Sequence, residues 1–359
     1  MIRVVTFGEI MLRVSTPGAA RFRQAIPGRL ETVFGGAEAS VAISIANFGG
    51  RAAYVTALPD HEIGDACVRE LLAHRVSTDN ILRIKDARLG LYFYEAGINQ
   101  RPGRVIYDRA DSAFASASSD SWDWATILKD ADWLVLSGIT PAVSASAAES
   151  ALVALESARK SGVRVAFDVN YRAKLWHWSR ELAKEELAAR YLARCASQAD
   201  LLFCGPEEAV RFLGVDASLF DNSSEGSESI YRALSTMMPN VRWIASSVRA
   251  SPKDQISRYA GFLWDREEDR FFCSHPPRDG YAIGTLVDRL GIGDAFAAGL
   301  VFGLGTRPSD DAEHTLEAIR FATAAGCLAH SIEGDANQVS REEVLRLVQQ
   351  GGAEGRVER

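Results

Sequence analysis

The apolar positions of the chain follow two alternating patterns. Short runs rich in β-branched residues alternate with longer segments in which apolar residues recur with helical spacing. This alternation predicts strands joined by crossover helices, and therefore a mainly parallel sheet. The expected strands are residues 4–7, 53–57, 133–136, 163–167, 201–203 and 243–246. The expected helices are residues 37–48, 65–74, 145–160, 180–196, 208–213, 294–304, 311–330 and 341–349.

Two inserts interrupt the alternation. Residues 12–34 and 89–110 contain Gly, Pro and alternating polar and apolar positions without a helical face. They predict antiparallel strands outside the main sheet, and one small lid built from both inserts explains them together. Further expectations are a strand pair at 256–264 and 270–274, a surface loop at 216–229, and a frayed tail at 351–359.

Composition narrows the class of protein. The 359 residues are 47% apolar and 24% charged, as in an ordinary globular protein, and we expect one domain over residues 1–350. Scattered basic residues and a net charge of −7 argue against nucleic acid as a partner. No apolar run approaches the ~20 residues that span a bilayer, so we expect no membrane partner. Five distant cysteines without a C-x-x-C pair indicate reduced thiols, and hence a cytoplasmic protein.

Two glycine segments are the best candidates for binding and chemistry. Gly291 and Gly293 begin a long apolar helix, whose free N–H groups and positive dipole end favour a phosphate. Asp294 beside them is either a reactive carboxylate or a helix cap. Gly35 and Gly36 open an alanine-rich helix, where they either admit a small polar ligand or form a tight turn.

Several common enzyme motifs are absent. The sequence lacks the P-loop, H-E-x-x-H and G-x-S-x-G patterns. A dinucleotide fingerprint starting at Gly291 fails because Phe296 stands at its third glycine position.

The joint order of these segments resembles the PfkB-type, or ribokinase-like, carbohydrate kinases, and among them the 2-keto-3-deoxygluconate kinases. The resemblance runs from about residue 4 to residue 348. It is carried by residues 8–13, 34–39, 57–60 with 63–65, 104–109 with 112–113, 168–172, 287–289 with Gly291 and 293–294, and 334–335 with Asn337.

The resemblance implies a fold and a reaction. The implied fold is an α/β, ribokinase-like three-layer sandwich with a mainly parallel central sheet and a small β-sheet lid. The implied reaction transfers a phosphoryl group from ATP to a sugar hydroxyl, with Asp294 as general base. The backbone at Gly291 and Gly293 would form the anion hole that stabilises the transferred group.

The resemblance also implies a sugar-acid site. Arg109 and Arg172 fall on positions that would hold a carboxylate, since a guanidinium can donate two parallel hydrogen bonds to it. The alternatives are a lid-surface charge for Arg109, pairing with Asp168 for Arg172, and core packing for Tyr92. The full set implied for the substrate is Gly35, Gly36, Tyr92, Tyr107, Arg109, Arg172, Asp294 and Asp335.

The nucleotide and metal sides are implied in the same way. Magnesium is expected with ATP, and Glu208 is the candidate for holding its waters, although an acidic residue at a helix start is common for dipole reasons alone. The small residues Ala325 and Gly326 either leave room for an adenine ring or only allow close packing between helices. The residues implied for the nucleotide are Asn170, Ser247, Arg249, Gly291, Gly293, Ala325 and Gly326.

Three departures from the family pattern keep other functions open. Ser40 and Gly205 stand where these kinases usually have Asn, and Ile292 replaces a usually small residue in the anion hole. The alternatives to a 2-keto-3-deoxygluconate kinase are a kinase for a ketohexose or another sugar acid, and a catalytically weakened sugar-acid binding protein. A nicotinamide oxidoreductase is a more distant alternative. The lid also predicts a homodimer, because a small sheet standing off a body exposes edges and an apolar face.

Overall fold

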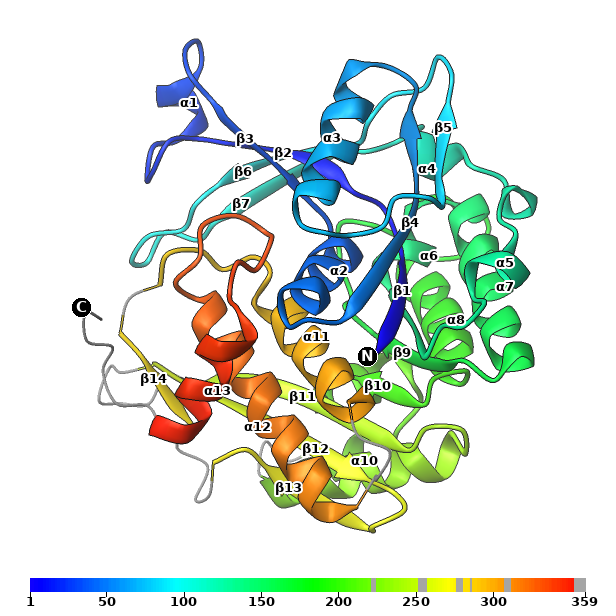
Figure 1. Ribbon diagram of the computed structural model, residues 1–359, viewed down its shortest axis with the longest axis vertical. Helices are drawn as coiled ribbons and strands as arrows, with labels where there is room; N and C mark the ends of the chain where they lie inside the picture. The colour runs from blue at the N-terminus through cyan, green and yellow to red at the C-terminus, as the bar shows by residue number, and fades with distance from the viewer. Residues whose placement is uncertain (221–223, 251–256, 276–279, 285, 307–310, 352–359) are drawn as a thin grey trace.

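The protein, seen here as a computed structural model, is built around a twisted sheet flanked by helices (Figure 1). The structure describes residues 1–220, 224–250, 257–275, 280–284, 286–306 and 311–351. In this part of the chain the main sheet has the strand order β13-β12-β11-β10-β9-β8-β1-β4-β5, with β14 paired to β12. Its strands are β1 (Arg3–Phe7), β4 (Arg51–Pro59), β5 (Ile81–Ile84), β8 (Trp133–Ser137), β9 (Arg164–Asp168), β10 (Leu201–Phe203), β11 (Trp243–Ala250), β12 (Ser257–Asp265), β13 (Arg270–Cys273) and β14 (Tyr281–Ile283).

Neighbouring strands from β11 to β5 are parallel, and β12 runs antiparallel to β11, β13 and β14. A parallel sheet needs both faces covered, which explains why its strands are apolar on both sides. In β1, Val5 and Phe7 pack in one buried cluster, whereas Val4 packs in the other. The predicted mainly parallel sheet is therefore confirmed.

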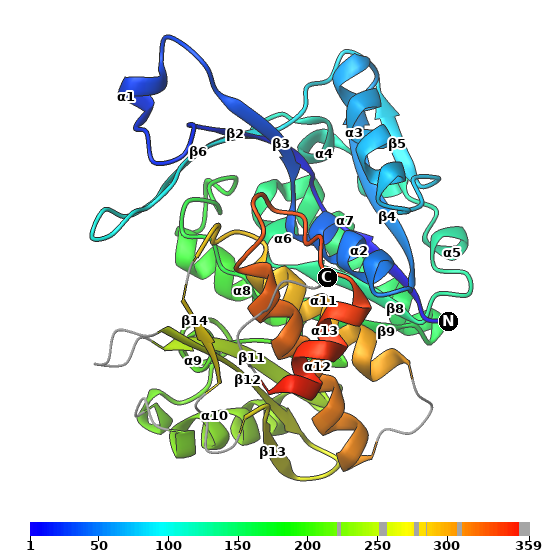
Figure 2. The same cartoon turned by 60° about the vertical axis from the view of Figure 1, so that its left-hand side comes forward.

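Helices cover both faces of this sheet (Figure 2). One buried cluster joins the sheet to α7 (Ala145–Ser161), α8 (Lys184–Ala196) and α10 (Ser224–Met237). The other joins it to α2 (Ala37–Asn47), α11 (Ile292–Gly305) and α12 (Ala312–Ala329). The remaining helices are α1 (Phe22–Ala25), α3 (Glu62–Ala73), α4 (Ala113–Ser116), α5 (Trp124–Ile127), α6 (Ile139–Val143), α9 (Pro206–Phe212) and α13 (Arg341–Gln350), and every helix in the described ranges is too short or too polar to cross a membrane.

Helices α11 and α12 approach each other closely because small residues line their contact. A Cβ on Gly299 would lie 2.8 Å from the Cα of Ala322, and one on Gly303 would lie 2.9 Å from the Cα of Ala318. Since real Cβ atoms are not found this close to a neighbouring backbone, glycine sets the distance between the two helices. This packing fixes the direction of α11, whose N-terminus carries Asp294.

The lid is a separate four-stranded sheet with the order β3-β2-β6-β7. It consists of β2 (Met11–Ser15) and β3 (Glu31–Gly35) from the first insert, and β6 (Leu91–Glu95) and β7 (Arg104–Asp108) from the second. It stands off the body at the top of Figure 1. One expectation was wrong, since the lid is not wholly antiparallel: two antiparallel hairpins are joined by the parallel pair β2 and β6.

The loop predicted at residues 216–229 was also wrong in its second half, where α10 begins at Ser224. The serines and acidic residues at the start of α10 resemble a loop, but Ile230, Tyr231 and Leu234 behind them form a buried helical face. The predicted strand pair is present as β12 and β13. Residue 256 and the tail from 352 onward lie outside the described residues.

A substitution at the contact between α11 and α12 tests what sets their distance. We expect Gly299→Val to destabilise the protein by about 1–3 kcal/mol, because the added side chain must push the backbone of α12 away. Thermal unfolding measures the effect. Gly284→Val is the matched control, since a Cβ there has no heavy atom within 4 Å. Equal melting temperatures for the two variants would contradict this account of the packing.

Candidate active site

Polar residues gather at the carboxyl edge of the parallel strands, which is where open α/β sheets bind ligands. Glu9 follows β1, Asp168 ends β9, and Glu208 follows β10 at the start of α9. Ser247 and Arg249 lie in the last part of β11. The same edge faces the lid, so the body and the lid share one site.

Two glycines shape the N-terminus of α11, where the sequence predicts an anion hole. Gly291 is its N-cap residue, with a left-handed φ of 78° that side chains rarely adopt. Gly293 is exposed, and a Cβ there would meet no protein atom within 4 Å. Nothing in the described structure requires glycine at residue 293 for packing, which leaves the helix end open to a ligand.

Asp294 is the third residue of α11 and lies half-buried among other acidic groups. Desolvation and the charge of Asp168 raise the pKa of Asp294 well above its ordinary value, and the nearby Arg172 opposes this rise. The same effects act on Asp168, where desolvation and Glu208 raise the pKa to about 7. A carboxylate with a raised pKa is a stronger base than an ordinary one, which suits the role of general base that the resemblance implies.

A hollow beside Asp294 contains every residue that the sequence predicted for the sugar side. Its walls come from the lid, the start of α2, the segment after β9 and the loop before α11. The predicted residues that line it are Gly35, Gly36, Tyr92, Tyr107, Arg109, Arg172, Gly291, Asp294 and Asp335.

Arg109 is less available to a ligand than the sequence predicted. Its Nε donates to Oε2 of buried Glu9 at 2.7 Å, and its Nη2 lies 2.5 Å from the same oxygen. Ser112 Oγ donates to the other oxygen of Glu9. Arg109 is thus a buried, ion-paired residue rather than a lid-surface charge, and Glu9 fixes its orientation in the wall of the hollow.

Arg172 behaves differently. It is exposed and lines the hollow, and within the described residues it has no carboxylate at ion-pair distance. The alternative of a salt bridge with Asp168 is therefore not realised, although Arg172 still lowers the pKa of Asp168 electrostatically. Arg172 thus lines the hollow as a cation that no carboxylate of the described residues holds in an ion pair.

Asp335 and Tyr92 are joined by a short hydrogen bond. Tyr92 Oη donates to Asp335 Oδ2 at 2.5 Å, and Arg13 Nη1 donates to Asp335 Oδ1 at 2.9 Å. Tyr92 therefore contributes a fixed polar edge to the hollow as well as packing. The sequence alone assigned no role to Arg13 or Glu9, although both belong to the motif at residues 8–13. The signal that could have identified them is a pair of charged residues beside a buried strand.

The nucleotide-side predictions divide into two groups. Asn170, Ser247 and Arg249 lie at the carboxyl ends of β9 and β11, and all are at least partly accessible. Ala325 and Gly326 do not reach the surface in this way. Ala325 is fully buried beside Gly299, and a Cβ on Gly326 would overlap the Tyr259 ring. The small size of these two residues therefore serves the packing of α12, and their contact with a nucleotide stays a prediction.

Glu208 caps the start of α9, which is one of the two roles that the sequence left open for it. Its Oε2 accepts from the backbone N–H of Gly205 at 3.0 Å and its Oε1 from that of Tyr171 at 3.5 Å. Its negative charge also reaches Asp168. The carboxylates of Glu208 and Asp168 offer oxygen ligands with excess negative charge, which is the kind of ligand that Mg²⁺ prefers. No group of three or more metal-ligating side chains is found among the described residues.

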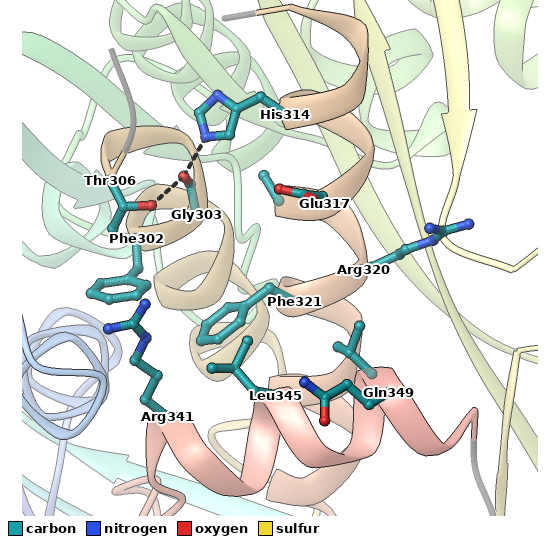
Figure 3. A pocket seen from close by; sticks show the side chains of 12 residues that line it. Phe302, Gly303, Thr306, His314, Glu317, Arg320, Phe321, Arg341, Leu345 and Gln349 are labelled. Carbon is teal, nitrogen blue, oxygen red and sulfur yellow. Dashed lines mark hydrogen bonds between the residues drawn. The ribbon is translucent and has the colours of Figure 1, made fainter. Parts of the chain in front are cut away.

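A larger hollow of about 330 Å³ lies between α11, α12 and α13 (Figure 3). Phe302, Phe321 and Leu345 line it, and His314 Nε2 donates to the Gly303 carbonyl at 2.8 Å at one end. It contains none of the residues predicted for the sugar or the nucleotide, so size alone does not identify the active site.

Comparison with known proteins decides the family. The model of the pfkB family of carbohydrate kinases matches residues 1–240. The chain belongs to this family. The predicted family is thus confirmed, and with it a kinase fold in which the lid and the N-terminus of α11 face each other across the hollow.

The similarity of this PfkB kinase to individual proteins extends over nearly the whole chain. It is 30% identical over 354 residues to a 2-dehydro-3-deoxygalactonokinase from Haloferax volcanii, covering 98% of each chain. It is 34% identical to the crystal structure of a 2-dehydro-3-deoxygluconokinase from Thermotoga maritima, with a TM-score of 0.85 and coverage of 97% and 100%. A fructokinase from Xylella fastidiosa with bound ATP shares the fold at 21% identity and a TM-score of 0.76, covering 97% and 98%. The ribokinase-like fold is confirmed.

The raised pKa of Asp294 predicts how activity of this PfkB kinase depends on pH. If Asp294 must be ionised, kcat/KM falls toward acidic pH through the raised pKa. Asp168→Asn removes a negative charge that raises this pKa, so we expect the acidic limb to move to lower pH. A pH profile of kcat/KM for the sugar measures the shift. Asp269→Asn on the distant turn before β13 is the control, and an unmoved limb in Asp168→Asn would contradict the assignment.

Proposed function

We propose that this PfkB kinase transfers the γ-phosphoryl group of ATP to the primary hydroxyl of a 2-keto-3-deoxy sugar acid, with 2-keto-3-deoxygluconate as the first candidate. The observation that carries this proposal is Arg172, an unpaired cation in the same hollow as Asp294. A carboxylate-bearing substrate supplies the missing partner of Arg172, whereas a neutral sugar leaves it unpaired. The two relatives named for 2-dehydro-3-deoxy sugar acids support the same substrate class.

In the proposed reaction, Arg172 binds the substrate carboxylate, and Arg109, held by Glu9, forms the wall beside it. Tyr107 lines the lid side and presents its hydroxyl to the sugar. Gly35 and Gly36 let the sugar lie against the backbone at the start of α2. Together these contacts orient the primary hydroxyl toward Asp294.

Asp294 accepts the proton of that hydroxyl as its oxygen attacks the γ-phosphorus, and the bond from this phosphorus to the β-bridging oxygen breaks to release ADP. The N–H groups at Gly291 and Gly293 stabilise the charge on the transferred group. Asn170, Ser247 and Arg249 bind the nucleotide. Asp168 and Glu208 would hold the waters of Mg²⁺, which neutralises phosphate charge when bound.

The departures from the family pattern lie near this machinery. Ser40 is buried inside α2, Gly205 is the N-cap of α9, and Ile292 is the first residue of α11. A binding protein that has lost the chemistry is the competing proposal for this reason. A ketohexose or another sugar acid is the competing substrate within the kinase class.

The direct test is ADP release by the purified protein with Mg-ATP and one sugar at a time. The sugars are 2-keto-3-deoxygluconate, its galactonate epimer, fructose, ribose and gluconate. We expect release with a 2-keto-3-deoxy acid and not with fructose or ribose. Asp294→Asn should lower kcat by about 10²–10⁴-fold, the usual contribution of a general base.

Arg172→Gln is the substrate-class variant in this experiment, and it should raise the KM for the keto acid. Arg180→Gln, on the exposed segment before α8, is its control. Tight binding of the keto acid without ADP release would favour the binding protein. Release with fructose alone, unchanged in Arg172→Gln, would contradict the sugar-acid proposal.

We also propose a homodimer formed through the lid. Val14, Phe93 and Ile106 lie side by side on the face of the lid opposite to Arg13 and Tyr92. Ile106 is 49% exposed, and Phe93 is covered only in part, by Phe22 of α1. An apolar sheet face of this kind is stable in water when a second surface covers it.

A charged side chain on the outer face of the lid tests the dimer. We expect Ile106→Glu to convert a dimer of the wild-type protein into a monomer, because two copies would bring buried charges together. Light scattering at micromolar concentration measures the mass. Leu345→Glu on α13 is the control, since Leu345 is a similarly exposed apolar residue away from the lid. A wild-type monomer would refute the proposal.

The cysteines support a location in a reducing compartment, and we propose the cytoplasm. All five are free, and Cys67, Cys195 and Cys204 are buried. Burial raises the pKa of the Cys67 and Cys195 thiols to about 12, so they are protonated and unreactive at neutral pH.

A further inference from the structure

Arg13 is a buried arginine at the junction of the lid and the body. It lies on β2, and only 5% of its surface is exposed. Its Nη2 donates to Asp288 Oδ2 at 2.7 Å and its Nη1 to Asp335 Oδ1 at 2.9 Å. Both carboxylates belong to the body, far along the chain from β2. A single guanidinium thus ties the lid to two separate segments of the body.

The remaining surface of this guanidinium is also occupied. Nε donates to Ser15 Oγ at 2.8 Å, and the guanidinium carbon lies 4.3 Å from the centroid of the Tyr94 ring. Burial lowers the pKa of Arg13, but Asp335 and Asp288 outweigh this and the net shift is upward, so it remains charged. With each side engaged by protein, Arg13 acts on a substrate through its partners.

The first partner, Asp288, shapes the turn that leads into α11. Its Oδ1 accepts from the backbone N–H groups of Arg289 and Leu290, at 2.6 and 3.2 Å. Its Oδ2, which Arg13 holds, also accepts from the N–H of Gly334 at 3.2 Å. Gly291, the left-handed N-cap of α11, follows directly after this turn. The position of Asp288 therefore sets where the N–H groups of the anion hole point.

The second partner, Asp335, belongs to the sugar side. Tyr92 Oη donates to the oxygen that Arg13 does not hold. A side chain on Gly35 would overlap this Asp335 carboxylate, so the first glycine of the pair is needed to let it approach. Arg13 therefore also fixes one wall of the hollow in which the sugar would lie.

We propose that Arg13 is a positioning residue for phosphoryl transfer, which holds the anion hole through Asp288 and the sugar wall through Asp335 in one fixed relation. This inference rests on the proposed function. The hydroxyl that attacks and the N–H groups that stabilise the transferred phosphoryl group belong to different segments. The reaction requires them to be aligned within a fraction of an ångström.

Arg13→Lys tests this role, because an ammonium keeps the charge but lacks the planar fork that reaches two carboxylates at once. We expect kcat/KM for the sugar acid to fall by about 10²-fold, the cost of a small misalignment at the reacting centre. ADP affinity, measured by calorimetry, should stay unchanged, because Arg13 contacts none of the proposed nucleotide residues. Asp288→Asn should reproduce the loss of kcat, and the double variant should be no worse than the poorer single variant.

Arg242 offers a matched control at the opposite edge of the sheet. It also stacks on an aromatic ring, Trp243 at 4.3 Å, and it also pairs with two carboxylates, those of Asp265 and Glu267. Arg242→Lys should reduce stability and leave the kinetic constants unchanged. If both lysine variants lower kcat/KM in proportion to their loss of stability, Arg13 has only a structural role and the inference fails.

The outcomes separate this inference from the proposed function. No turnover by the wild-type protein with any sugar would refute the proposed function. Turnover by the wild-type protein that Arg13→Lys leaves unchanged would refute the positioning role alone. If Arg13→Lys does not fold, Asp288→Asn provides the test, because its side chain retains an oxygen that accepts from the N–H groups of Arg289 and Leu290. Wild-type kinetics in Asp288→Asn would overturn the inference.

Discussion

The concentration of negative charge at one edge of the sheet is the constraint on which the rest of the site depends. Parallel strands bring their carboxyl ends together, and here Glu9, Asp168 and Glu208 at those ends share one region with Asp294 at the start of α11. Burial and, to a lesser degree, the neighbouring carboxylates make Asp168 and Asp294 costly to ionise, and both effects raise their pKa values. Three arginines, Arg13, Arg109 and Arg172, offset the charge in different ways. Arg13 and Arg109 form ion pairs with carboxylates of the protein. Of these three arginines, Arg172 is the one that the described residues leave available to a ligand.

Much of the fold and the site could be predicted from the sequence, because the information was local. Apolar periodicity located the strands of the parallel sheet, and glycines followed by an apolar helix located the N-terminus of α11. The ordered motifs then indicated which residues line the hollow. The start of α10 was missed because its polar first turn resembles a loop, and its buried face becomes evident only from Ile230 onward.

What could not be predicted involves partners that are distant in the chain. Arg13 is separated from Asp288 by 275 positions and from Asp335 by 322, and no pattern in a single sequence links them. Arg109 was recognised as an important cation, but its pairing with Glu9, 100 positions away, was not visible. Ala325 and Gly326 illustrate a different limit, since small residues serve a ligand and a helix contact equally well in sequence.

The parallel pairing of β2 with β6 has a consequence for how this protein can fold and change. The two hairpins of the lid come from separate stretches of chain, with strands β4 and β5 and helices α2 and α3 of the body between them. Their pairing closes a long loop, whose entropy cost favours prior assembly of the intervening body. The lid is therefore not a module that can be excised or exchanged as one contiguous segment. A change of substrate by recombination would have to carry the first third of the chain with it.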